Sequence, residues 1–264
     1  MPWTFSHPAA VLPLTRLSPR YLSLPALVCG SLTPDIGYYF GLHDLATVAH
    51  SVAGTFWLCI PIGLLCLLTF YLFRRPVWFL LPQPHRDALE SFVAHRPDVT
   101  VRFIVVAIVS VLVGAWTHIV WDSFTHWNGW GVRQIPVLYR MWLEFDAFVF
   151  PGYAVLQHLS TLVGATILSM AYFSWLSKQP SKAHEDHRGN RMRYRAILGG
   201  VVFSIAVAIP TAHAAATDPE GEFHRSLFVF KVAVFSASIF AALLVAFSAY
   251  YFYSRRNVTT STSR

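Results

Sequence analysis

The segment WTHIVWDSFTHW carries a histidine, an aspartate and a second histidine at intervals of four residues, namely His118, Asp122 and His126. On an α-helix this spacing places successive side chains about 40° apart, so that they form one stripe. Imidazole and carboxylate are donors that suit zinc, with manganese or iron as alternatives. The stripe therefore predicts a divalent metal site. If the helix continues past Trp121, Asp122 lies between the two histidines and is able to bridge two ions.

Three further residues are candidate ligands for the same site. His50 precedes one long apolar segment, and His158 lies near the start of another. Asp35 follows a Thr-Pro turn signal in CGSLTPDIGYYF, where it either caps the following helix or completes the ligand set. A lone histidine on an apolar face is more often a core residue than a ligand. Ionisable residues in membrane segments are costly, however, and are functional candidates by default.

The composition identifies a membrane protein. The 264 residues are 55% hydrophobic and only 12% charged, which is about half the charged share of an average soluble domain. Five stretches approach the roughly 20 apolar residues that a spanning helix needs: Ser51–Phe73, Val101–Trp121, Ala154–Leu176, Arg195–Ala215 and Leu227–Tyr253. A sixth stretch, Tyr21–Leu42, is broken by prolines, a glycine and an aspartate, which favours a broken or surface-lying element over a clean span. We predict an all-α integral membrane helical bundle with five to six transmembrane helices.

The distribution of basic residues predicts the orientation of these helices. The net charge is +7, but the lysines and arginines cluster in short loops between apolar runs, which argues against a nucleic-acid partner. Alternating five helices places the most basic loops, 74–100 and 177–194, on the same side as the basic C-terminal tail. By the positive-inside rule that side is cytoplasmic. We therefore expect a multi-pass cell-membrane protein with its metal site on the outer, periplasmic or extracellular side and membrane lipids as partners; the sequence identifies no protein partner.

The chain shows no repeat and no composition shift that would separate domains. We expect a single polytopic membrane domain over 1–264, with three parts. Residues 1–50 form an N-terminal segment that carries His7 and Asp35, residues 51–176 form the metal-site helices, and residues 195–253 form a C-terminal helix pair. The three cysteines lie in apolar segments, and their odd number argues against a disulfide framework.

Several separate motifs resemble one bacterial membrane-protein family, domain of unknown function 4184. They are MPWTFSHPAAVLPL at the N-terminus, GSLTPDIGYYF, His50-Ser51 with Gly54, the His118-x3-Asp122 helix, and QHLST at Gln157–Thr161. The resemblance covers most of the chain. It implies a membrane protein and supplies no established activity.

A more distant resemblance implies chemistry. The order of a histidine, then Pro-Asp, then His-Ser, then His-x3-Asp is similar to membrane-bound metal-dependent hydrolases and, through them, to zinc-dependent phospholipase C. In that family one zinc is held by an aspartate, a histidine and a His-x3-Asp pair. The matching residues here are Asp35, His50, His118 and Asp122, so the resemblance implies one complete zinc site.

The same resemblance implies only partial sites for further ions. A second zinc in that family uses two histidines, which His126 and His158 match, and a glutamate four residues after the second, where this chain has Leu162. A third zinc uses a free N-terminal residue, with no evident equivalent here, and a histidine that His7 matches. Taken from its sequence alone, the His7-Pro8 pair is also typical of a plain turn. The full candidate ligand set is then His7, Asp35, His50, His118, Asp122, His126 and His158.

Two functions of different classes are consistent with these residues. The first is a membrane-embedded metal-dependent hydrolase that acts on a lipid or lipid-linked phosphoester at the outer membrane edge. In this hypothesis Asp122 bridges or ligates the metal, and Asp35 ligates it and orients the attacking water. The alternative is a non-catalytic membrane protein with a structural metal site or an ion or proton path. A path needs polar residues at several depths, whereas here they concentrate at one edge.

Overall fold

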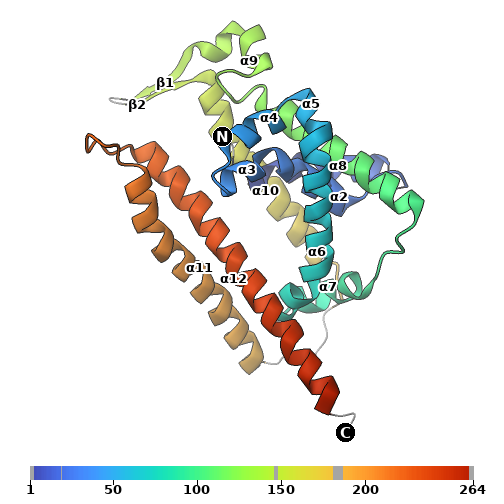
Figure 1. Cartoon of the computed structure of the whole chain (residues 1–264). Coiled ribbons are helices and arrows are strands. Elements are labelled where there is room, and N and C mark those ends of the chain that lie inside the picture. The colour runs from blue at the N-terminus through green and yellow to red at the C-terminus, as the bar shows by residue number, and fades with distance from the viewer. Residues whose placement is uncertain (1–2, 19, 146–147, 181–186, 262–264) are drawn as a thin grey trace. The chain divides into compact units, whose positions relative to one another are not determined.

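The computed structural model describes residues 3–18, 20–145, 148–180 and 187–261 and is predominantly helical (Figure 1). The predicted all-α fold is therefore confirmed. The chain divides into two compact units. The first comprises Met1–Gly37, Leu42–Thr69 and Pro97–Lys178, and the second comprises Tyr38–Gly41, Phe70–Arg96 and Gln179–Arg264. All the candidate ligands belong to the first unit.

Five helical stretches are long and apolar enough to cross a membrane, so the chain is a multi-pass membrane protein. The first stretch runs through α5 (Val52–Gly54), a π-helical turn (Thr55–Cys59) and α6 (Ile60–Leu80). The others are α8 (Val101–Asp122), α10 (Gly152–Leu176), α11 (His187–Ala215) and α12 (Arg225–Ser261). These are the five segments that hydropathy predicted, with somewhat different ends.

The N-terminal part of the first unit consists of short helices. In order they are η1 (Thr4–Val11), α1 (Leu12–Leu17), α2 (Leu24–Leu32), η2 (Thr33–Asp35), α3 (Ile36–Tyr39) and α4 (His43–Ala49). The stretch 21–42 is thus broken, as its prolines predicted. Its longest helix, α2, has nine residues, fewer than half of what a span needs. It does not lie on the surface, because it packs against α8 and its Leu27 is fully buried.

Small residues bring α2 and α8 close together. A Cβ atom at Gly30 would overlap the backbone of Val111, and one at Gly114 would overlap the backbone carbonyl of Leu27. The hydroxyl of Ser110 also accepts a hydrogen bond from the backbone N–H of Ser23, at 2.9 Å. In a membrane such close backbone packing drives helix association, since lipid tails are as apolar as the side chains. The contact fixes the position of the chain that follows α2, which includes Asp35.

A small β-hairpin lies between α8 and α10. After α9 (Trp130–Gln134) and η4 (Pro136–Tyr139), strands β1 (Met141–Phe145) and β2 (Phe148–Pro151) pair antiparallel. The sequence indicated only a loop over this region. The hairpin leads directly into α10, so it sets where that helix begins.

In the second unit, helices α11 and α12 pack side by side along their length (Figure 1). Helix α7 (His85–Ala94) belongs to the same unit. The backbone N–H of Gln83 donates to Asn190 Oδ1 at 2.9 Å, and Arg193 Nε donates to the backbone carbonyl of Phe79 at 3.1 Å. These bonds join the start of α11 to the region around α7.

The α2–α8 contact makes a direct prediction for Gly114. We expect Gly114→Ala to lower the free energy of unfolding by about 1–3 kcal/mol, because the added methyl forces two backbones apart. The matched control is Gly199→Ala on α11, where an added Cβ meets no described atom within 4 Å and better helix propensity is neutral or stabilising. Thermal unfolding of the detergent-solubilised protein measures both. Equal midpoints for the two variants would contradict the close packing.

Candidate metal centre

Four side chains from three elements converge in the first unit. Asp35 is the last residue of η2, His50 follows the last residue of α4, and His118 and Asp122 lie one turn apart at the end of α8. Each offers one ligand atom, and these four atoms all lie within 4.8 Å of one another. The structure thus brings together residues that are up to 87 positions apart in the sequence.

The distances among these atoms match those of a tetrahedral metal shell. His118 Nε2 lies 3.2 Å from Asp122 Oδ2 and 3.5 Å from Asp35 Oδ1. His50 Nε2 lies 3.5 Å from each of the same two oxygens. Zinc bonds to nitrogen and oxygen of roughly 2.0–2.1 Å place neighbouring tetrahedral donors about 3.3–3.4 Å apart. The four histidine–aspartate distances therefore suit donors that share one zinc ion, and the remaining two pairs of donors lie within 4.8 Å.

The burial of the cluster favours the binding of a positively charged group between its carboxylates. The exposed fraction is 0% for His118, 1% for Asp35 and 6% for Asp122. Asp35 Oδ1, His118 Nε2 and both carboxylate oxygens of Asp122 are buried and make no hydrogen bond within the described residues. Burying a carboxylate costs several kcal/mol unless it is paired and hydrogen-bonded. Two such carboxylates beside the unbonded Nε2 of His118 fit a divalent cation.

Backbone carbonyls orient both histidines of the cluster. His118 Nδ1 lies 2.7 Å from the carbonyl oxygen of Ser31, and His50 Nδ1 lies 2.7 Å from that of Ala46. A carbonyl oxygen only accepts, so each Nδ1 carries the hydrogen that it donates. In the neutral ring the lone pair is then on Nε2, the atom that faces the cluster. This is the usual outer-shell support of a metal-binding histidine.

Thr4 supports the carboxylate in the same way. Its hydroxyl donates to Asp35 Oδ2 at 2.7 Å, which leaves Oδ1 directed at the two histidines. Thr4 belongs to η1, and this element also packs against α2, α8 and α10. The N-terminal segment therefore helps to fix one ligand although it lies 31 residues away in the sequence.

His50 and His7 both lie outside the membrane-spanning segments, and their charges at pH 7 differ. At His50, burial opposes protonation, but the carboxylates of Asp122 and Asp35, each 3.5 Å from Nε2, outweigh it and raise the pKa to about 9. At His7, burial together with the neighbouring His118 lowers the pKa to about 4. His7 is therefore neutral at pH 7, as a metal ligand must be. His50 carries a proton at this pH, so a metal ion has to displace that proton before it binds to the ring.

His7 lies on the other side of Asp122. Its ring stacks on that of His118 with centroids 3.8 Å apart, and its Nε2 is 3.5 Å from Asp122 Oδ1. Neither ring nitrogen makes a hydrogen bond within the described residues. Asp122 thus presents Oδ2 to the four-residue cluster and Oδ1 to His7. This arrangement suits a carboxylate that bridges two ions, but with His7 on the second side and not the His126 that the helical spacing predicted.

The structure changes the prediction for His126. Helix α8 ends at Asp122, so the expected helical stripe does not continue, and His126 lies in the turn that follows. Its Nδ1 faces the backbone carbonyl of Asp122 at 3.1 Å and must donate there, although it is also 3.7 Å from Asp122 Oδ2. His126 therefore borders the cluster without directing this nitrogen at it as a ligand.

His158 is not brought to the cluster. It is exposed on α10, and its ring meets that of Phe150 edge-on with centroids 6.0 Å apart. The residues of α10 that face α8 include Leu156 and Ser160. At 100° per residue His158 points roughly 150° away from that face. We therefore drop His158 from the candidate ligands.

Sequence reasoning missed the supporting groups of the centre. Two of them are backbone carbonyls, those of Ser31 and Ala46, and a carbonyl leaves no signature in residue type. The third, Thr4, stands three residues before His7, and no local pattern links it to Asp35. Only the packing of η1 against α2 could have revealed it.

Fold and site together define a multi-pass helical membrane protein with a buried His/Asp cluster of metal-site geometry. The chain belongs to the family described as Domain of unknown function (DUF4184), whose model matches residues 1–248. The family resemblance of the sequence motifs is therefore confirmed. No curated protein and no solved structure matches the chain.

The hydrogen bond from Thr4 makes a second prediction. We expect Thr4→Val to weaken zinc binding about 10–100-fold, the usual cost of removing an outer-shell partner, while Thr4→Ser restores it. The control is Thr15→Val, because the Thr15 hydroxyl donates to the carbonyl of Leu12, away from the cluster. Competition with a fluorescent chelator measures the zinc Kd. An unchanged Kd in Thr4→Val would show that Asp35 needs no such support.

Proposed function

We propose that the chain is a membrane-embedded metal-dependent hydrolase with a zinc centre at Asp35, His50, His118 and Asp122. One observation carries the proposal: four donors from three elements meet within 4.8 Å of one another, and three of the four residues bring buried ligand atoms without a hydrogen bond. The distant resemblance to zinc-dependent phospholipase C points to the same four residues.

The chain's own residues would divide the work as follows. When bound, a divalent ion supplies Lewis-acid chemistry, polarising a phosphoryl or acyl oxygen and acidifying water. Asp35, held through Oδ2 by Thr4, would be a ligand of the ion and would orient the attacking water. Asp122 would be a second ligand, and its Oδ1 faces His7, which would be a ligand of any second ion. The side chain of His50 is 23% exposed, so water reaches the centre from its side.

The position of the centre supports a lipid or lipid-linked phosphoester as substrate. Asp122 is the last residue of a 22-residue apolar helix, so the centre belongs at the boundary between hydrocarbon and water. By the positive-inside rule this is the outer boundary. A phosphoester at the headgroup level of a lipid would meet the centre there.

One observation favours a second candidate, a structural metal site. Four protein donors at tetrahedral spacing are enough to close the shell of zinc, and structural sites are closed whereas catalytic sites keep a position open. An ion or proton path is less well supported, because the cluster lies at one end of α8 and not at several depths. The number of exchangeable water ligands distinguishes the structural site from the hydrolase.

The metal content of purified protein tests the centre itself. We expect about one zinc per chain in the wild type, by analogy with single structural or catalytic zinc sites, and almost none in His118→Ala and Asp122→Ala. His158→Ala is the matched control and should keep its zinc. Elemental analysis after gel filtration and circular dichroism excludes loss by unfolding; His50→Ala, at the exposed edge, serves if the buried variants fail to fold.

Activity and coordination number then separate the two candidates. With bis(p-nitrophenyl) phosphate as a generic phosphodiester, the zinc-loaded wild type should hydrolyse and Asp122→Ala should not. X-ray absorption of the hydrolase should reveal an oxygen ligand that exchanges with solvent. An unchanged zinc content in both His118→Ala and Asp122→Ala would contradict the proposed metal centre. Zinc bound with a closed protein shell and no hydrolysis would favour the structural site.

Labelling from outside the cell tests the proposed orientation. Glu220→Cys lies in a loop expected outside, and Lys178→Cys lies in a basic loop expected in the cytoplasm; both positions are exposed. An impermeant maleimide should modify Glu220→Cys in intact cells and Lys178→Cys only after permeabilisation, over the background of the native cysteines. The reverse pattern would move the proposed centre to the cytoplasmic side.

A further inference from the structure

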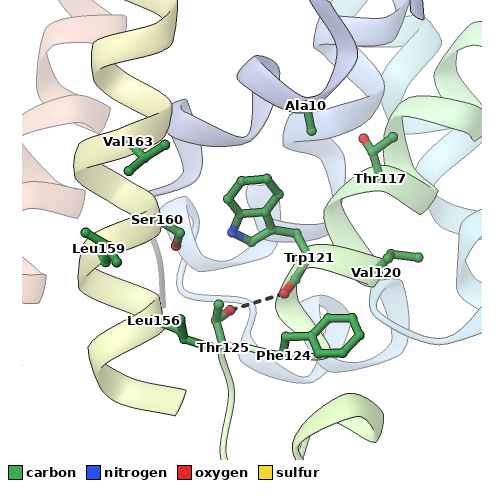
Figure 2. Close-up of a pocket in the computed structure, with 10 residues that line it drawn as sticks. All are labelled: Ala10, Thr117, Val120, Trp121, Phe124, Thr125, Leu156, Leu159, Ser160 and Val163. Atoms are coloured by element: carbon green, nitrogen blue, oxygen red, sulfur yellow. Dashed lines mark hydrogen bonds between the residues drawn. The ribbon is translucent and has the colours of Figure 1, made fainter. Parts of the chain in front are cut away.

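We propose that a groove between α8 and α10 holds one acyl chain of a membrane glycerolipid, the substrate class of the centre described above. The inference rests on the proposed hydrolase function. The groove has a volume of about 520 Å³, within the range of small-molecule sites. Figure 2 shows the ring of Trp121 between the two helices, with Ser160 of α10 on the side nearest to it. Leu156, Leu159 and Val163 of α10 also line the groove.

The groove adjoins the candidate centre through Trp121. The ring of Trp121 meets that of His7 edge-to-face with centroids 6.3 Å apart. Asp122, a proposed ligand, is the next residue in the chain. Ala10, on the same short element as His7, also lines the groove. A molecule that lies against Trp121 is therefore next to the ring that packs on His7, one residue before Asp122.

The chemistry of the walls selects hydrocarbon. Three hydroxyls line the groove, and each donates to a carbonyl of its own helical turn: Thr117 to Gly114, Thr125 to Trp121 and Ser160 to Gln157. Their hydrogens are thus already used, and the remaining lining is aliphatic or aromatic. The indole N–H of Trp121 is the one further donor in this lining. A sugar or peptide would therefore find few polar partners there, whereas an acyl chain needs none.

The dimensions of the groove favour a chain over a helix. Its lining residues span 117–125 on and just beyond α8 and 156–163 on α10, which is about 10–12 Å along each axis at 1.5 Å per residue. A partner transmembrane helix would instead pack along much of the roughly 30 Å hydrocarbon core. Val120 and Leu159 remain 60% and 52% exposed, which leaves surface for a flexible chain to cover.

Within a bilayer the groove would act by orientation. An acyl chain gains little by leaving lipid for an equally apolar wall, because no water is displaced. A chain aligned between α8 and α10 is instead held at the end where the centre lies, so its ester and phosphate groups are directed toward Asp122. Side chains that fill the groove would then decide which lipids react.

Photolabelling of the full-length protein tests the proposal. The protein is reconstituted in nanodiscs of unlabelled phosphatidylethanolamine with a trace of phosphatidylglycerol that carries a diazirine in one acyl chain. Mass spectrometry should place the label preferentially on the groove faces of α8 and α10. Leu159→Trp, which fills the groove, should reduce this labelling about tenfold, as expected for an overpacked site. Leu162→Trp, on an exposed face of α10, is the matched control and should leave it unchanged.

Zinc analysis of the same samples separates this inference from the proposed function. Leu159→Trp should retain the zinc of the wild type, and His118→Ala should lose zinc while it keeps the groove label. Equal labelling of the Leu159 and Leu162 faces in zinc-loaded protein would overturn the groove alone. Cross-links between two copies through α8 and α10 would overturn it in favour of a helix partner. If the wild-type protein binds no zinc but is labelled in the groove, the hydrolase proposal is wrong and the lipid-binding groove is supported.

Discussion

The burial of two carboxylates, Asp35 and Asp122, is the constraint on which the first unit depends. Each is almost fully removed from solvent, and their oxygens face His118 and His50 at 3.2–3.5 Å. Unpaired charges so placed are strongly destabilising, so a cation, whether proton or metal, must accompany them. The surrounding elements are arranged to serve this need: a hydroxyl and two carbonyls fix the donors, and α8 supplies two ligands one turn apart.

Proximity of donors alone does not make such a centre, as a second group in the same chain demonstrates. Asp218, Glu222 and His224 also bring ligand atoms within 4.8 Å of one another. Glu222 and His224 are exposed, however, and Asp218 Oδ1 already accepts hydrogen bonds from the backbone N–H groups of Glu220 and Glu222. Its charge is thus satisfied by the turn and by water. The central cluster differs because its oxygens are buried and have no such partners.

How far the sequence predicts this structure depends on the range of each interaction. The five spans follow from composition, and the turn between His118 and Asp122 follows from helix period, so both were predicted. Asp35 and His50 were placed near them by family resemblance and by counting helices. Two outcomes depend on the loop and hairpin between α8 and α10. One is the end of α8 at Asp122, which redirects His126, and the other is the rotation of α10, which turns His158 away. Hydropathy carries no information about either.

The juxtaposition of the groove and the centre follows from the same geometry. Gly164 of α10 lies so close to Ser6 that an added Cβ would come within 2.9 Å of its side chain, and the Ser6 hydroxyl donates to the carbonyl of Thr161. Helix α10 is therefore held by η1, the element that also carries His7. Because η1 lies between α8 and α10, it supplies both a wall of the apolar groove and the approach to the charged cluster. An amphiphilic molecule is the kind of ligand that suits both surfaces, because its apolar part matches the groove and its polar part matches the cluster. A wholly polar or a wholly apolar molecule would match only one of them.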